Sequence, residues 1–241
     1  MGNDDDAYKE AIEFACNHVS TLNEESQIIL YALFKSNVGW LTRIYDDKTV
    51  KLMFKGHKFS DCDSLIKIET KKTINKYHSS PNWIVVCMGM DSDTVLELEN
   101  IYGISTIIAI PWLSDGLDKW IKNLGAKELR GNEIPDDVQD PNCIVIQALN
   151  ELTQNINMST GITNPNDERR AKTIVRTFKK YNIDVDSDQI EGYLIRVLFW
   201  KASHAKQFSD LIRKIETGKR FQGGDKTGLQ HYYKKWKTNC E

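Results

Sequence analysis

Two largely apolar runs stand in the middle of the chain, Trp83–Met88 ("WIVVCM") and Ile104–Ile110 ("ISTIIAI"). Runs of this kind, rich in β-branched residues, are typical of strands buried on both faces of a sheet. Each is followed by a helical pattern that ends at a glycine, Gly103 or Gly125, as helices commonly do. The order β-α-β-α predicts adjacent parallel strands with right-handed crossovers, and "AKELRG" is a candidate third strand.

The first third of the chain shows a changing period of apolar positions. A helix is expected over residues 6–19, and a second helix after Thr21, which with Glu24 forms a capping box. In "WLTRIYDDKTVKLMF" apolar and polar residues alternate around two aspartates, which predicts a hairpin with strands Leu41–Tyr45 and Thr49–Phe54.

The segment from residue 58 to residue 81 is compatible with two structures. Ile66, Thr70, Ile74 and Tyr77 recur at helical spacing among good helix formers, which favours a helix. If Leu65–Lys71 is instead a strand, its charged residues share one face and its isoleucines share the other, because side chains alternate along a strand.

The last part of the chain is predicted to be helical. "DPNCIVIQALNELTQNIN" begins with Asp140 as N-cap and Pro141 at the first helical position. Three further helices are expected over residues 168–181, 188–199 and 202–217, followed by a flexible glycine-rich tail. The small, polar segment at residues 159–167 suggests a domain boundary. The prediction is a Rossmann-like α/β domain over residues 1–158 and a smaller all-helical region over 159–241.

Composition excludes several classes of protein. Hydrophobic residues at 40% and charged residues at 27% indicate a folded globular chain, and the apolar run ending at Leu113 is too short to span a membrane. The five cysteines form no CxxC pair and the five histidines form no metal motif. Reduced thiols in a cytoplasmic protein are therefore expected. Cys87 is the one candidate nucleophile, but the sequence shows no base to activate it.

Charge is distributed unevenly along the chain. Residues 1–160 hold 15 Lys and Arg against 24 Asp and Glu, whereas residues 161–241 hold 17 against 10. Between Arg196 and Lys237 there are 11 basic and 3 acidic residues, with seven aromatic residues interleaved. This composition suits a phosphate backbone and unpaired bases. The residues predicted to contact nucleic acid, or else an acidic protein, are Lys219, Arg220, Lys234, Lys235 and Lys237.

A candidate ligand site lies where the two predicted parallel strands end, because open α/β sheets bind ligands at the carboxyl ends of their strands. The residues expected there are Gly89, Ser92, Thr94, Trp112 and Ser114. Asp91 or Ser92 also suits the N-cap of the following helix, and Asp93 suits its first turn, so capping alone explains the segment.

The segment "VCMGMDSDTVL" resembles the phosphatase motif of the haloacid dehalogenase-like family, in which an apolar strand ends in DxDx before Thr or Val. The resemblance implies Asp91 as nucleophile and Asp93 as acid/base. A magnesium ion would be held by Asp91, Asp93 and the "IPDDVQD" loop with Asp136, Asp137 and Asp140. The spacing to Asp136 is shorter than in that family.

The other segment that resembles a catalytic motif is the ambiguous one. If it is a strand, Asp61 or Asp63 with Glu69 and Lys71 resembles the D…ExK pattern of PD-(D/E)xK nucleases. The resemblance implies that two carboxylates hold magnesium and that the lysine orients the attacking water.

The sequence thus predicts a binding protein with a small-ligand or nucleotide cleft and a basic helical region that contacts nucleic acid or an acidic partner. The alternative is a magnesium-dependent phosphoryl-transfer hydrolase acting through one of the two carboxylate sets. No membrane partner is expected, and the sequence specifies no oligomeric state.

Overall fold

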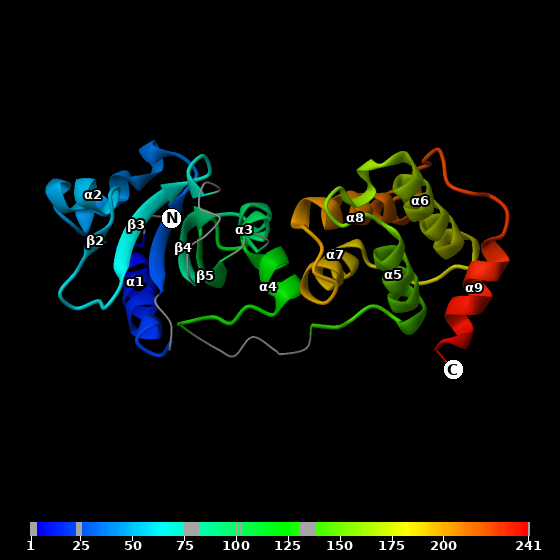
Figure 1. The fold of residues 1–241 in the computed structure, drawn as a ribbon, viewed down its shortest axis with the longest axis horizontal. Helices are drawn as coiled ribbons and strands as arrows, with labels where there is room; N and C mark the ends of the chain where they lie inside the picture. Colours follow the sequence, from blue (N-terminus) through cyan, green and yellow to red (C-terminus); the bar gives the residue numbers. More distant parts are fainter. Residues whose placement is uncertain are drawn as a thin grey trace. The chain divides into compact units, whose positions relative to one another are not determined.

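The computed structural model describes residues 4–22, 26–74, 82–99, 101, 103–130 and 138–240. The chain divides into two compact units, Met1–Asp118 and Lys119–Glu241. The first unit holds a five-stranded sheet and the second is helical (Figure 1). The predicted combination of an α/β region and an all-helical C-terminal region is confirmed.

The sheet has the strand order β2-β3-β1-β4-β5, and its strands are β1 (Gln27–Ala32), β2 (His57–Lys58), β3 (Leu65–Thr70), β4 (Trp83–Met90) and β5 (Ile104–Pro111). All neighbouring strands are parallel except the short edge strand β2, which is antiparallel to β3. In the pairing of β4 with β5, Val85 lies opposite Ile107. The predicted adjacent, parallel strands in the middle of the chain are therefore present.

One face of the sheet packs against α1 (Asp5–Val19), as Figure 1 shows. Ile28, Ile66 and Ile84 come from three neighbouring strands and are fully buried in one core with Ile12 and Ala15 of the helix. Because side chains alternate along a strand, this core takes every second residue of each strand. The other residues of β1 and β4 are buried as well, which explains why these strands are apolar throughout.

The helix predicted after Thr21 is wrong, because residues 27–32 form strand β1 in the centre of the sheet. A short apolar run fits a buried strand and a buried helix equally well by its pattern. Pairing with β3 on one side and β4 on the other decides between the two, and the sequence does not show that pairing.

The predicted hairpin is also wrong. Its residues form the 3₁₀ helix η1 (Lys35–Arg43) and the helix α2 (Asp47–Met53). Asp46 is the N-cap of α2, with its side chain accepting hydrogen bonds from the backbone N–H groups of Lys48 and Thr49. The two aspartates taken for a hairpin turn therefore mark the beginning of a helix, which is a common use of aspartate.

The favoured helix over Leu65–Lys71 is wrong, and the strand alternative is right for residues 65–70, which form β3. Pairing with β1 fixes this segment as a strand in spite of its helical spacing. The candidate third strand "AKELRG" is wrong over residues 126–130, which lie in neither strand nor helix. Unlike β4 and β5, this segment is not a long apolar run, so its pattern does not favour a buried strand beside β5.

The helical unit contains α4 (Asp118–Leu124), whose first residue belongs to the sheet unit, and then α5 (Cys143–Asn155), η3 (Gly161–Thr163), α6 (Pro165–Lys180), α7 (Ser187–Arg196), α8 (Ala202–Glu216) and α9 (Leu229–Thr238). The four predicted helices correspond to α5, α6, α7 and α8. The N-cap of α5 is Asn142, whose side chain accepts from the backbone N–H of Val145, and not Asp140. Asp140 instead pairs with Arg196.

The helix α9 packs on α5 and α6. Its Trp236 is buried and donates its indole N–H to the Glu151 carboxylate of α5 at 2.8 Å. The domain boundary at residues 158 and 159 and the flexibility of the glycine-rich tail stay predictions.

A disulfide joins Cys143 at the first residue of α5 to Cys240 beyond the end of α9, with 5.8 Å between the two Cα atoms. The expectation that all cysteines are reduced is therefore wrong for this pair. The two cysteines lie 97 residues apart in sequence, and only the packing of α9 on α5 brings them together. The disulfide also removes the argument from reduced thiols on which the cytoplasmic prediction was based.

In the part of the chain that the structure describes, no helix is both long enough and apolar enough to cross a membrane.

Candidate functional site

At the end of β4, the predicted ligand-binding segment is built around hydrogen bonds within the chain. The Asp91 carboxylate caps α3 (Ser92–Leu98) and accepts from the backbone N–H of Thr94 at 2.8 Å. The Ser92 hydroxyl and backbone N–H both donate to the Gly116 carbonyl, at 2.9 and 2.8 Å. The capping interpretation of this segment is confirmed, with Asp91 as the N-cap and Asp93 in the first turn.

Gly89 and Trp112 meet at the same edge of the sheet. Gly89 has φ +63°, and a Cβ atom there would lie 3.0 Å from the indole ring of Trp112, so a side chain at this position would crowd the ring. Trp112 is nonetheless 68% exposed, and Ser114 is exposed as well. The structure thus brings Gly89 and Trp112 together at the ends of β4 and β5, and a ligand site there stays a prediction.

Two residues of the nuclease-like pattern, Glu69 and Lys71, form ion pairs with residues outside the pattern. Glu69 is buried on β3 and pairs with Lys67 at 2.7 Å, because residues two apart on a strand share a face. Lys71 pairs with Glu97 at 2.6 Å, and Asp61 is exposed. Among the described residues, no three His, Cys, Asp or Glu side chains lie close enough together to hold a metal ion.

Asp136 and Asp137, the predicted magnesium ligands of the phosphatase-like arrangement, lie outside the described residues. Both magnesium-dependent alternatives stay predictions.

Cys87, the candidate nucleophile, is completely buried in β4. Burial raises the pKa of its thiol far above the ordinary value, because the low-dielectric interior disfavours the thiolate. Burial also raises the pKa of Cys16, whose thiol neighbours Cys62. These thiols are packing residues of the sheet unit.

We therefore expect the three free cysteines, Cys16, Cys62 and Cys87, to react slowly with 5,5′-dithiobis(2-nitrobenzoic acid) at about pH 8 in the native protein. In urea, three thiols should react at once, while the disulfide pair remains silent. One fast thiol in the native protein that disappears in Cys87→Ala would contradict this account.

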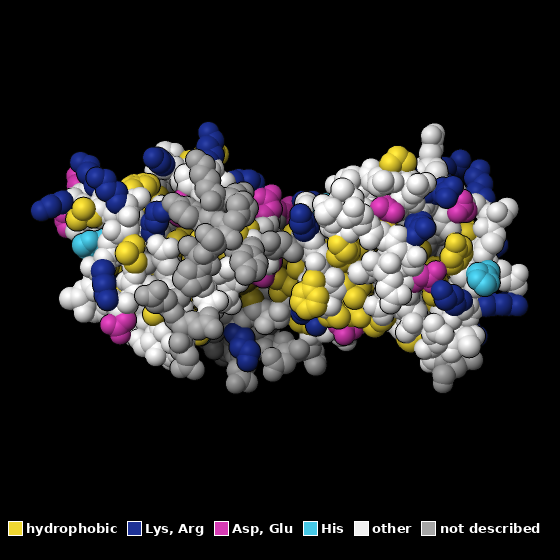
Figure 2. All heavy atoms as spheres, in the orientation of Figure 1, with side chains coloured by type: hydrophobic (Ala, Val, Ile, Leu, Met, Phe, Trp, Pro, Cys, Tyr) yellow, Lys and Arg dark blue, Asp and Glu magenta, His cyan; other side chains and the backbone are white. Residues whose placement is uncertain are grey.

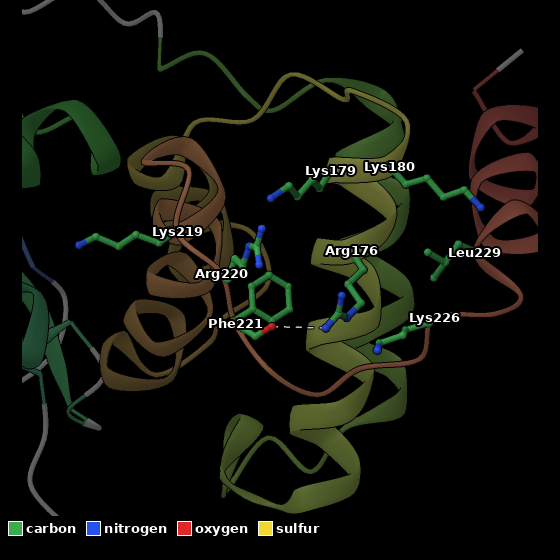
Figure 3. Close-up of a pocket in the computed structure, with 8 residues that line it drawn as sticks. All are labelled: Arg176, Lys179, Lys180, Lys219, Arg220, Phe221, Lys226 and Leu229. Carbon is green, nitrogen blue, oxygen red and sulfur yellow. Dashed lines mark hydrogen bonds between the residues drawn. The ribbon is translucent and has the colours of Figure 1, made fainter.

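The helical unit contains a basic cavity of about 510 Å³. It lies between the last turns of α6, the loop that follows α8 and the first residue of α9 (Figure 3). Its lining consists of six cationic residues, one aromatic residue and one leucine: Arg176, Lys179, Lys180, Lys219, Arg220, Lys226, Phe221 and Leu229. Figure 2 shows Lys and Arg side chains gathered over the α6 and α9 end of this unit.

Lys219 and Arg220 of the basic cavity were predicted from the sequence as contacts to nucleic acid. Arg176, Lys179 and Lys180 were missed, although their spacing places them on one face of a helix, because residues three and four apart are neighbours there. Lys226 was missed because its place depends on the course of the loop.

The charge of the basic cavity is not compensated within the described chain. None of its six cationic residues forms an ion pair with a described Asp or Glu, whereas nearby Lys172 pairs with Glu168 and Lys235 pairs with Glu151. The carbonyl end of α6 also faces this region, and a helix carbonyl end repels anions. Any attraction for an anion must therefore come from the cationic side chains.

The predicted lysines of α9 lie outside the lining of the basic cavity. Lys234, Lys235 and Lys237 are exposed, and Lys235 contacts Glu151 at 3.1 Å. Tyr233 is half-buried and stacks on Tyr181 of α6, with 4.1 Å between ring centroids. This stacking helps to hold α9 on α6.

Comparison with known proteins adds one finding. Residues 141–237 match a family model. The family is described as a domain of unknown function (DUF1889), and the matched residues include α5 to α8 and nearly all of α9. Neither the curated proteins nor the solved structures contain a match. The family description names no activity, so a function has to be argued from the geometry of the helical unit.

Proposed function

We propose that the protein binds nucleic acid through the basic cavity of its helical unit, with the phosphate backbone held by the cationic side chains. The observation that carries the proposal is that six cationic residues line one concave surface without a described carboxylate partner. Lys and Arg side chains are the usual ligands of nucleic-acid phosphates, and their contacts supply most of the affinity for such backbones.

The clustered cations carry an energetic cost that a bound polyanion would remove. Like charges gathered on one concave surface repel one another, so their clustering lowers stability. Four of the six, Lys179, Lys219, Arg220 and Lys226, make no hydrogen bond or ion pair with a described residue that would offset this repulsion. A polyanion would neutralise the cluster and relieve the repulsion. A surface that serves only solubility has no need to gather its cations in one cavity.

The sheet unit is assigned no ligand in this proposal. The proposal keeps three predictions made from the sequence. The protein is cytoplasmic, and Lys234 and Lys237 extend the contact with nucleic acid along α9. An acidic protein is the alternative partner for the same cationic residues. The magnesium-dependent alternative has gained no supporting observation in the described residues, since Glu69 and Lys71 are already paired.

The proposal predicts salt-dependent binding. The logarithm of the association constant for a fluorescein-labelled oligonucleotide should fall linearly with the logarithm of salt concentration, with a slope of about −3 to −5 for four to six phosphate contacts. Fluorescence anisotropy of the intact chain over a salt series measures this slope. No binding at low salt, or binding insensitive to salt, would contradict the proposal.

A further inference from the structure

Among the described residues that line the basic cavity, Phe221 is the only aromatic one. It is half-buried and does not belong to the fully buried core of the helical unit. In Figure 3 its ring lies in the middle of the cavity, between the side chains of Arg220 and Arg176. The position of an aromatic ring among cationic residues requires an explanation other than core packing.

The loop holds Phe221 in place through contacts with α6. Arg176 donates from Nε to the Gly223 carbonyl at 2.7 Å and from Nη2 to the Phe221 carbonyl at 3.3 Å. Its guanidinium also lies over the Phe221 ring, 5.0 Å from the centroid. A guanidinium over a ring face is attracted by the negative electrostatic potential of that face.

Two further contacts fix the loop after Phe221. Gly224 has φ +76° and packs so closely on α6 that a Cβ atom would lie 2.8 Å from the carbonyl carbon of Lys172. The backbone N–H of Asp225 donates to the Thr173 hydroxyl at 2.8 Å. The loop backbone is therefore held on α6 before any ligand binds. As a result, the loop loses less conformational entropy when a ligand contacts the ring.

We propose that the basic cavity takes single-stranded nucleic acid, with one base stacked on Phe221 and the adjacent phosphates held by the surrounding lysines and Arg220. This inference rests on the proposed nucleic-acid binding and adds the form of the strand. Single strands are bound by aromatic rings that stack on bases within basic grooves. In a duplex the base faces are covered by their neighbours and reach such a ring only after unstacking.

The size of the cavity agrees with this inference. Its volume of about 510 Å³ lies within the roughly 300–1,000 Å³ of pockets that enclose small ligands. It is large enough for a base with its sugar and phosphate. A compact polyphosphate without a base would use the cationic residues and leave the ring without a role, which separates the two ligands experimentally.

The test compares Phe221→Leu with Phe221→Trp in the intact chain. Leu keeps an apolar side chain but removes the ring, whereas Trp keeps an aromatic surface. The probes are a labelled 12-nucleotide single strand, the same backbone with abasic sites, the corresponding duplex, and inorganic triphosphate as competitor.

We expect Phe221→Leu to lower affinity for the single strand about 5- to 100-fold, which corresponds to the loss of one stacked base, and to leave the affinity for the abasic strand unchanged. Phe221→Trp should keep an affinity for the single strand close to that of the wild-type chain, because it retains an aromatic surface.

Three outcomes would overturn the inference while leaving phosphate binding in place: equal losses for the single strand and the abasic strand, tighter binding of the duplex than of the single strand, or a triphosphate affinity that Phe221→Leu lowers as much as it lowers the affinity for the single strand. An unaltered salt slope in Phe221→Leu confirms that the basic cavity is still formed. Absence of binding to every probe would overturn the proposed function as well.

Discussion

Replacing Lys179, Lys219, Arg220 and Lys226 together by Gln is expected to lower the affinity for a single-stranded oligonucleotide by about a thousandfold at about 50 mM salt. Each lost phosphate contact removes the free energy of counterion release, which is largest at low salt. The four residues line the same cavity and make no ion pair with a described carboxylate, so their removal leaves no buried charge without a partner.

A matched variant separates this effect from a general loss of charge. Lys48, Lys51, Lys55 and Lys58 are exposed residues of the sheet unit, and changing them to Gln removes the same number of positive charges. This control should change affinity by less than about threefold, since exposed charges outside the contact are screened within a Debye length. Similar losses in the two variants would show that binding follows net charge and not the basic cavity.

The cavity variant should also keep its thermal stability or gain some. Removing four like charges from one surface relieves repulsion, and no described ion pair is lost. Loss of affinity together with an unchanged or higher melting temperature is the pattern of a binding site.

Removing the disulfide is expected to have the largest effect on stability. In Cys143→Ala with Cys240→Ala, the free energy of unfolding of the helical unit should fall by about 4 to 5 kcal/mol, because the disulfide closes a loop of roughly 100 residues and restricts the unfolded chain. Urea titration followed by tryptophan fluorescence, to which the buried Trp200 and Trp236 of the helical unit contribute, measures this change.

A thiol reductant provides the control for the disulfide. It should lower the stability of the wild-type chain toward that of the double variant and leave the double variant unchanged. A double variant as stable as the wild type, or one that the reductant destabilises further, would contradict the assigned role of the disulfide.

The sequence predicted elements whose local pattern and tertiary environment agree. The apolar runs at residues 83–88 and 104–110 were predicted as parallel neighbours because both are rich in β-branched residues and a helix connects them. The position between strand and helix predicted a cap at Asp91 or Ser92, and the structure has Asp91. The sequence-based prediction was wrong at Ile28–Tyr31, because this apolar run suits a helix and a central strand equally well. Only its pairing with β3 and β4 decides between the two.

The sequence predicted the residues of the basic cavity that stand in a local basic stretch, and it missed those that only tertiary contacts bring there. Lys219 and Arg220 stand in a basic, glycine-rich stretch that the composition made visible. Arg176, Lys179 and Lys180 stand in an amphipathic helix whose polar face looks like any solvated face. They became part of the site only because the loop after α8 docks on α6 through Arg176 and Gly224. Contacts between segments some 45 residues apart leave no local pattern.

The central claim is that the cationic side chains of the basic cavity hold a phosphate backbone. Its most direct test is the salt dependence of oligonucleotide binding, measured side by side for the wild-type chain and the variant Lys179→Gln, Lys219→Gln, Arg220→Gln, Lys226→Gln. The account predicts that the slope becomes shallower by about three, at roughly 0.7 to 0.9 for each lost contact. An identical slope for the two proteins would contradict it.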